Sequence, residues 1–378
     1  MISVSGSGIA GLATALAVLR ADHPLTMITG KQPLPPLLGG LQLAPNGWRA
    51  LDHLGVAQAV RAHATTLSEI NLRDLATGAT LTVLNLAGPY TSIARADLAR
   101  ILSNAITDIA SAPSLAANIT HAVQHNRQQG GGLTLVLDSK LGTKLAPMKS
   151  DALIAADGIT GFGRNYVNSV DTNQPQPAKG RVAMRAVVDA QNLPRLFCQP
   201  HSNLWLGANA HIVHYPLQAG KLVNIVVTLD HSLADSDWQR RVLGQNSITA
   251  HLADNPAITW AKTRLPMQSF ETCWRRGRVV LAGDAAHPMP PNLAQGAGQS
   301  LEDATVLMQW LQAENIIDAS LSGYARDRAA KAGNVFKKAQ TSSKIMALGA
   351  PFSNLRNAAL GFGGSDLLNS WLAEVWTA

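Results

Sequence analysis

Residues 278–304, RVVLAGDAAHPMPPNLAQGAGQSLEDA, are the stretch that decides the fold. The run 279–282 is apolar and contains β-branched residues, which predicts a strand buried on both faces. The strand breaks at Gly283-Asp284, and an amphipathic helix is expected over about 295–312. Because the first amides of a helix have no intrahelical partner, this order of elements predicts a cradle for a polyhydroxylated, partly anionic ligand.

The first twenty residues supply the second half of such a site. Residues 2–5 are a strand-sized apolar run, the motif G-x-G-x-x-G follows at Gly6, Gly8 and Gly11, and apolar residues then recur at helical spacing. The glycines permit a tight turn and close approach of the backbone to a pyrophosphate. This βα unit predicts a dinucleotide site. A signal peptide or membrane segment is the alternative, but the stretch lacks a basic n-region and the glycines interrupt it.

A second strand is predicted over 25–29, and its last residue departs from the usual pattern. In dinucleotide folds this strand ends, about twenty residues beyond the glycines, in an acidic residue that binds the ribose hydroxyls. Here the position holds Thr29, followed by Gly30 and Lys31. A threonine hydroxyl can hydrogen-bond a ribose but is not a charged bidentate acceptor. We therefore expect weaker binding at the adenosine end, and Lys31 can instead favour a phosphate.

Composition and charge narrow the class of protein. The 378 residues include 31 basic and 24 acidic side chains, a formal net charge of +7. The basic residues are dispersed except around 275–278, so nucleic-acid binding is not expected, and the charge suits an anionic small molecule better. Cys198 and Cys273 lie far apart without metal-ligand spacing, so neither a disulfide framework nor a metal site is expected. A reduced, cytoplasmic location is the default expectation.

The pattern changes after about residue 174, where alternating apolar stretches predict an antiparallel sheet suited to housing a substrate. The chain then returns to the first sheet at Val279, so the predicted fold is α/β with a discontinuous Rossmann-like dinucleotide domain, an antiparallel-sheet substrate domain and C-terminal helices. The predicted divisions are 1–173 and 273–320 for the first domain, 174–272 for the substrate region and 321–378 for the helical tail.

Three ordered motifs carry a family resemblance: GSGIAG at 6–11, ADGITGFGR at 156–164 and the GDAAHPMPPNLAQGAGQSLEDA segment at 283–304. Together they resemble the class A single-component flavoprotein monooxygenases, the aromatic hydroxylases of the para-hydroxybenzoate and salicylate hydroxylase type. The resemblance extends over nearly the full chain. It implies an FAD-binding fold, with NADH or NADPH as a transient reductant.

The resemblance also implies cofactor contacts. The turn at 6–11 would receive the FAD pyrophosphate, Arg95 would touch FAD, and Asp157-Gly158 would serve both FAD and NAD(P)H. Asp284 would accept a ribityl hydroxyl, and Pro291 would lie beside the isoalloxazine. The amides that follow Gln295 would lie at the pyrimidine edge of the flavin. The implied cofactor set is Gly6, Gly8, Ile9, Ala10, Gly11, Thr29, Arg95, Asp157, Gly158, Gly283, Asp284, Gln295, Gly296 and Ala297.

Two positions depart from the family pattern. Thr29 replaces the usual glutamate, and Ala294 replaces the glycine common before Gln-Gly. In addition, Asn46 precedes a predicted helix over about 47–54 and is a plausible N-cap. Arg95 has an alternative interpretation as a surface arginine paired with Asp97, because such pairs are common.

The family chemistry would begin with reduction of FAD by NAD(P)H and addition of O2 to give a flavin hydroperoxide, whose distal oxygen passes to an electron-rich aromatic ring. A phenolic substrate is more reactive once deprotonated, so a base near neutral pKa is useful. On the predicted strand 211–215, His211 and Tyr215 share one face and His214 takes the other. We predict His211 and Tyr215 as the catalytic pair, with Pro291 beside the flavin; ordinary sheet residues are the alternative.

Two further side chains have competing interpretations. Arg185, on a neighbouring predicted strand, can bind an acidic substrate or face outward. His287, just after the flavin motif, is expected to orient the turn rather than to perform chemistry.

The function also has alternatives. The same fold serves hydroxylation of a larger hydrophobic substrate, such as a quinone precursor or polyketide. The Thr29 departure motivates a non-catalytic flavin-binding protein. The expected partners are a small aromatic substrate and O2, and the expected oligomer is a monomer or homodimer. Near-neutral mean hydropathy and a tryptophan-containing tail leave room for peripheral membrane contact.

Overall fold

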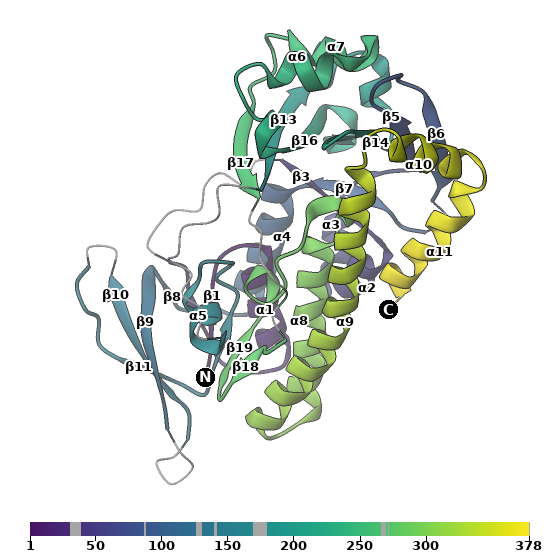
Figure 1. Ribbon diagram of the computed structural model, residues 1–378. Helices are drawn as coiled ribbons and strands as arrows, with labels where there is room; N and C mark the ends of the chain where they lie inside the picture. Colours follow the sequence, from purple (N-terminus) through teal and green to yellow (C-terminus); the bar gives the residue numbers. More distant parts are fainter. Residues whose placement is uncertain are drawn as a thin grey trace.

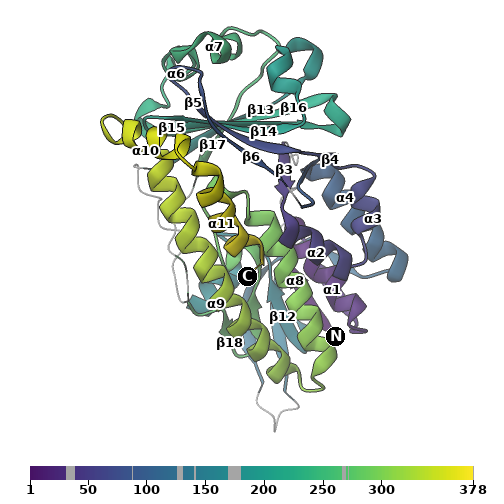
Figure 2. The same ribbon diagram turned by 90° about the vertical axis from the view of Figure 1, so that its right-hand side faces the viewer.

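Two large sheets at different ends of the molecule organise the fold (Figure 1). The computed structural model describes residues 1–30, 39–86, 88–125, 131–139, 142–168, 180–265, 270 and 272–377. In both views a broad sheet lies at one end, and helices α8 and α9 run side by side away from it (Figures 1 and 2). The predicted boundary at 173/174 and Lys31 fall outside the described residues.

The six-stranded sheet is the mainly parallel sheet that the sequence predicts for the first domain. Its strand order is β18-β19-β12-β1-β2-β8, and the neighbours are parallel except for β18 with β19. Its central strands are buried along their whole length, as expected for apolar runs covered on both faces. The late strand β19 pairs with β12, so the domain is discontinuous in sequence, as predicted. The strands are β1 (Ile2–Ser5), β2 (Leu25–Ile28), β8 (Ser114–Leu115), β12 (Ala152–Ala155), β18 (Arg275–Arg276) and β19 (Val279–Leu281).

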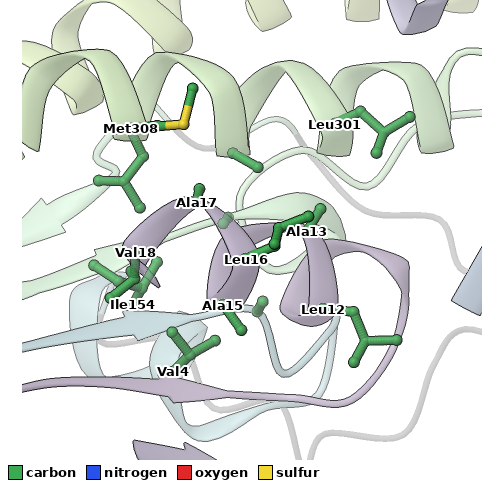
Figure 3. Close-up of a cluster of buried hydrophobic side chains, with 14 of the residues drawn as sticks. Val4, Leu12, Ala13, Ala15, Leu16, Ala17, Val18, Ile154, Leu301 and Met308 are labelled. Carbon is green, nitrogen blue, oxygen red and sulfur yellow. The ribbon is translucent and has the colours of Figure 1, made fainter. Parts of the chain in front are cut away.

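Helix α1 (Ile9–Arg20) lies between this sheet and helix α8 (Gly296–Ala313), and it is buried from Gly11 to Leu19. Figure 3 shows the alanine-rich turns of α1 facing Leu301 and Met308 of α8, with Val4 on the sheet below. Alanine side chains let the two helices approach closely, which brings the start of α8 near the start of α1.

The second sheet has seven strands in the order β17-β13-β16-β15-β14-β5-β6. All neighbours are antiparallel except β14 and β5, which are parallel. Helices α6 (Trp238–Val242) and α7 (Ser247–Ala253) cover its far face and close a second core (Figure 1). The strands are β5 (Glu69–Asp74), β6 (Thr80–Asn85), β13 (Arg181–Asp189), β14 (His201–Gly207), β15 (Ala210–Leu217), β16 (Leu222–Asp230) and β17 (Ala261–Leu265).

One part of the chain departs from the predicted division. The hairpin β5–β6 falls within 1–173, yet it forms the edge of the second sheet through pairing of β5 with β14. The strand pairing that causes this departure is long-range. His201 pairs with Glu69 across more than a hundred residues, and a local sequence pattern does not predict such a pairing.

The remaining elements frame the two sheets. No helix within the described residues combines the length and apolar character that a membrane crossing requires. Small sheets are formed by β3 (Gly40–Leu43), β4 (Thr65–Thr66) and β7 (Thr91–Ala94), and by β9 (Ala117–Gln124), β10 (Leu133–Ser139) and β11 (Met148–Ser150). The other helices are α2 (Pro45–His53), α3 (Ala57–Arg61), α4 (Arg95–Ile109), α5 (Phe162–Asn168), α9 (Ile317–Met346), α10 (Phe352–Gly361) and α11 (Gly364–Thr377).

Candidate functional site

The glycine turn between β1 and α1 has the geometry that a pyrophosphate site requires. Gly6 has a φ of +107°, and a Cβ there would lie 2.1 Å from the carbonyl oxygen of Ala156. A Cβ at Gly8 would meet nothing within 4 Å, so this glycine faces open space. The amides of Ile9 and Ala10 are among the first of α1, where helix N–H groups lack intrahelical partners. The turn therefore offers outward-pointing donors with no side chain in front of them.

Thr29 lies directly after β2, at the position predicted for ribose recognition. Its hydroxyl donates to the carbonyl oxygen of Leu115 at 3.4 Å, and its backbone N–H donates to the same oxygen at 2.9 Å. The hydroxyl oxygen keeps lone pairs for a ribose, but it carries no negative charge.

The segment 157–164 is anchored locally. The Asp157 Oδ2 accepts from the N–H of Gly163 at 3.0 Å, at the start of α5. Burial raises the pKa of Asp157 to about 6, and the Gly163 hydrogen bond opposes that rise. Gly158, with a φ of +78°, faces open space. Asp157 thus serves the α5 start, while Gly158 leaves room for a ligand.

Arg164 joins this segment to the third motif. Its side chain is buried, and its guanidinium donates to the carbonyl oxygen of Ala285 at 3.0 Å. Sequence reasoning did not select Arg164 as a site residue. Its place inside the ADGITGFGR motif was the available signal.

The turn Gly283–Ala285 (η7) brings the first and third motifs together. A Cβ at Gly283 would lie 2.4 Å from the Cβ of Ala10, so the turn touches the start of α1. Asp284 is exposed, and within the described part of the chain its carboxylate has no hydrogen-bond or ion-pair partner. A free carboxylate at this junction suits a polyhydroxylated chain such as ribityl.

The proline segment ends in a left-handed residue. Pro291 begins the short turn Pro291–Leu293 (η8) and is exposed. Ala294 follows with φ 52° and ψ 32°, a region that glycine adopts without a Cβ clash. Helix α8 then begins at Gly296, where no side chain caps the first amides and a Cβ would meet open space.

The side chain of Gln295, which directly precedes α8, turns inward. Its Oε1 accepts from Asn46 at 2.9 Å and from Gln299 at 3.2 Å. The prediction of Asn46 as an N-cap is wrong: Asn46 is the second residue of α2, which Ala44 precedes without a side-chain cap. Pro45 starts the helix two residues earlier than expected, since proline suits the first helical position. Asn46 instead connects α2 to α8.

Arg95, Arg185 and Tyr215 converge between the two sheets. Asp97 pairs with Arg100 at 3.1 Å rather than with Arg95, so the surface-pair alternative for Arg95 is wrong. Among the described residues neither the Arg95 side chain nor the Arg185 side chain has a hydrogen-bond or ion-pair partner. Burial lowers the pKa of Arg185, and the nearby charge of Arg95 lowers it further.

Tyr215 lies in the same place. Burial raises the pKa of the Tyr215 phenol to about 12, against the opposing effect of Arg95 and Arg185. Its ring packs near Gly40 of β3. The structure therefore gathers two unneutralised guanidiniums around a protonated phenol, an arrangement that attracts an anion.

His211 shares the Tyr215 face of β15, as predicted, but lies four residues away, about 13 Å along the strand. Burial lowers the pKa of His211 to about 3, and Arg181, whose guanidinium lies 3.5 Å from Nδ1, lowers it further. The prediction of a base near neutral pKa is therefore wrong for His211. The imidazole is neutral and can accept or donate a hydrogen bond. His214 points into the opposite core against Phe197.

Comparisons with known proteins agree with this geometry. Residues 2–339 match the family described as FAD binding domain. The chain belongs to that family. Within it, the chain is 31% identical over 323 residues to 3-hydroxybenzoate 6-hydroxylase of Klebsiella oxytoca, covering 80% of this chain and 78% of that protein. It is 33% identical over 339 residues to 3-amino-4-hydroxybenzoate 2-monooxygenase PtmB3 of Streptomyces platensis, covering 83% and 80%.

A solved structure shares the fold. Klebsiella pneumoniae HpxO complexed with FAD and uric acid superposes with a TM-score of 0.82 at 21% identity, covering 99% of this chain and 96% of that one. FAD is the cofactor of this family member, and the residues present fit it. Gly8, Gly158 and Gly296 face open space, Asp284 is a free acceptor, and two helix starts offer unpaired amides. The family is that of the class A aromatic hydroxylases, as the motifs predict.

Proposed function

We propose that this protein is an FAD-dependent monooxygenase that uses NAD(P)H and O2 to hydroxylate a small aromatic acid. The observation that supports an acidic substrate is the environment of Arg185. Its guanidinium is half-buried, has no acidic partner among the described residues and lies beside Arg95 and Tyr215. Arg185 is partly desolvated, and the like charge of the exposed Arg95 adds to that cost until an anion joins them.

The position of Arg185 supports this assignment. Arg185 pairs with Val226, which pairs with Val213, so Arg185 shares a sheet face with Tyr215. That face looks toward β3 and α4 of the FAD-binding half, as the contact of Tyr215 with Gly40 shows. A substrate on Arg185 would therefore lie between the sheet and the cofactor. Both curated relatives described above carry a hydroxybenzoate in their names.

The neighbouring groups suit a phenolic ring. Tyr215 keeps its proton at neutral pH and can donate a hydrogen bond to a phenolate or carboxylate oxygen. Neutral His211 can accept a hydrogen bond from a substrate hydroxyl and orient it. FAD supplies the oxygen activation, and the buried sheet face excludes water from the reacting ring.

The test compares a charged substrate with a neutral one. We would measure NAD(P)H oxidation, O2 uptake and hydroxylated product for a series of hydroxybenzoates and for the matching hydroxybenzamides. Arg185→Met should raise KM for the acid about 10- to 100-fold, the loss of one charged hydrogen bond, while leaving FAD affinity intact. Arg264→Met, an exposed arginine on the adjacent strand β17, is the control. Equal KM effects on acid and amide would refute the assignment of Arg185.

A separate measurement addresses the non-catalytic alternative. Bound FAD should bleach when NADH or NADPH is added without oxygen. Stable FAD binding without bleaching by either nucleotide would refute the enzyme proposal and leave a flavin-binding protein. Turnover with a quinone precursor or polyketide, and none with small acids, would favour the larger hydrophobic substrate.

A further inference from the structure

A buried polar network links the two ends of the FAD site to the C-terminal helix α9. Its first branch centres on Asp303, whose side chain is fully buried. Asp303 Oδ2 accepts from the N–H of Gly283 at 2.8 Å and lies 2.6 Å from His287 Nε2. Asp303 Oδ1 accepts from Arg328 Nε at 2.7 Å. One carboxylate thus fixes both ends of the turn that presents Asp284.

The second branch reaches the start of α8. Arg328 donates to Glu302 at 2.9 Å and to the side-chain oxygen of Gln299 at 2.8 Å. The other oxygen of Glu302 accepts from Asn46 at 2.6 Å, and Asn46 also donates to Gln295 at 2.9 Å. Gln295 directly precedes the first amides of α8, so this branch ends where the flavin edge is predicted.

Arg328 is the junction of the two branches, and its charge is needed there. The sequence places two carboxylates side by side at Glu302 and Asp303, both buried. Burial lowers the pKa of Arg328, but Asp303 and Glu302 outweigh burial and raise it overall. Burial raises the pKa of Asp303, but His287 and Arg328 hold it below its usual value. Both partners are therefore ionised. Removal of the guanidinium would leave Asp303 with His287 as its only ionisable partner among the described residues. It would leave Glu302 with only the partly exposed Lys331, whose Nζ lies 2.8 Å from Oε2.

We propose that Arg328 is a positioning residue for the flavin. It fixes the position of the turn Gly283–Ala285 relative to the start of α8. It does so through Asp303 on one side and through Gln299, Glu302 and Asn46 on the other. Arg328 is buried, and it acts on the site through these hydrogen-bonded partners. Helices α8 and α9 lie side by side in both views, which lets a residue far along the chain reach the site (Figures 1 and 2).

A purely structural role predicts a different outcome. An ion network that only joined α9 to α8 would change the stability of the fold, not the relative affinity for oxidised and reduced flavin. A positioning role also changes that ratio. With FAD bound, the α8 amides would stabilise negative charge at the flavin edge, so their displacement would disfavour the reduced form.

The experiment uses the full-length protein reconstituted with FAD. Arg328→Met should weaken FAD binding at least tenfold, measured by quenching of flavin fluorescence. Arg328→Lys should recover part of the loss, because lysine keeps the positive charge but lacks the planar set of donors of the guanidinium. Arg326→Met, an exposed arginine two residues away that pairs with Asp327, should stay within about twofold of the parent protein. A folded Arg328→Met protein that binds FAD as the parent does would overturn the proposal.

A milder variant keeps the proposal testable where Arg328→Met does not fold. Asn46→Leu removes the link from Glu302 through Asn46 to Gln295. It leaves the Gln299–Gln295 hydrogen bond and the ion pairs of Arg328 in place. We expect the two-electron midpoint potential of the bound flavin to fall by about 30 mV, equivalent to a tenfold change in the affinity ratio. An unchanged potential would overturn the proposal. Neither readout uses an aromatic substrate, so both stand independently of the proposed hydroxylation.

Discussion

Replacement of Asp157 by asparagine should make the cofactor-free protein more stable at neutral and alkaline pH. The Asp157 carboxyl is buried, and burial raises its pKa to about 6 from the ordinary 3.8. The folded state therefore favours the protonated carboxyl. The stability that this protonation contributes is fully present below about pH 3.8 and is lost as the pH rises through about 6. The difference corresponds to about 3 kcal/mol.

Asparagine keeps an oxygen that can accept from the Gly163 N–H and removes the charge. We therefore expect Asp157→Asn to gain up to about 3 kcal/mol over the parent above pH 7 and to lose most of that advantage near pH 4. The assay is urea unfolding of the apoprotein across this pH range, followed by tryptophan fluorescence. Asp254→Asn, at an exposed carboxylate, is the control. A parent and variant that respond identically to pH would refute the burial argument.

Three further predictions concern the cofactor and substrate sides of the site. Thr29→Glu should tighten FAD binding about tenfold, measured by fluorescence titration, because it adds a charged acceptor for the ribose; unchanged affinity would contradict the placement of Thr29. Ala294→Gly should raise the free energy of unfolding by about 0.5–1 kcal/mol, because it relieves the left-handed strain at φ 52°, and a loss of stability would show that the strain is absent. Tyr215→Phe and His211→Ala should each slow hydroxylation about tenfold or more with FAD binding intact, and full coupled turnover in both would remove them from the site.

The elements that local pattern predicts well are those buried on both faces. The strand at residues 2–5, the helix after the glycine turn and the strand that begins at Val279 follow directly from apolar runs and glycine positions. The pairing of β5 with β14 could not be predicted in this way, because it depends on which strand of the distant sheet has an unpaired edge. Local alternation gives a strand its two faces but not its neighbour.

In the candidate site, too, local patterns predicted some features and long-range contacts determined the others. The alternation of residues along the strand correctly placed His211 and Tyr215 on one face. It carries no information about how deeply a side chain is buried, and burial is what lowers the pKa of His211. The role of Asn46 depends on Gln295 and Glu302, roughly 250 residues away, so its local N-cap signal was misleading. Arg328 lacked any local signal as a site residue, since its importance comes from two carboxylates on another helix.

The late position of β19 and α9 has a consequence for how the chain matures. A ribosome makes β1, β2 and β12 early, but the sheet they begin lacks β19 until Val279–Leu281 emerges. Glu302 and Asp303 then remain without their guanidinium until Arg328 follows. The sheet of the nucleotide-binding half is therefore completed only after the strands of the second sheet have been synthesised. An intermediate ending before Arg328 would leave Asp303 with His287 as its only ionisable partner among the described residues, and Glu302 would lack both Arg328 and Lys331.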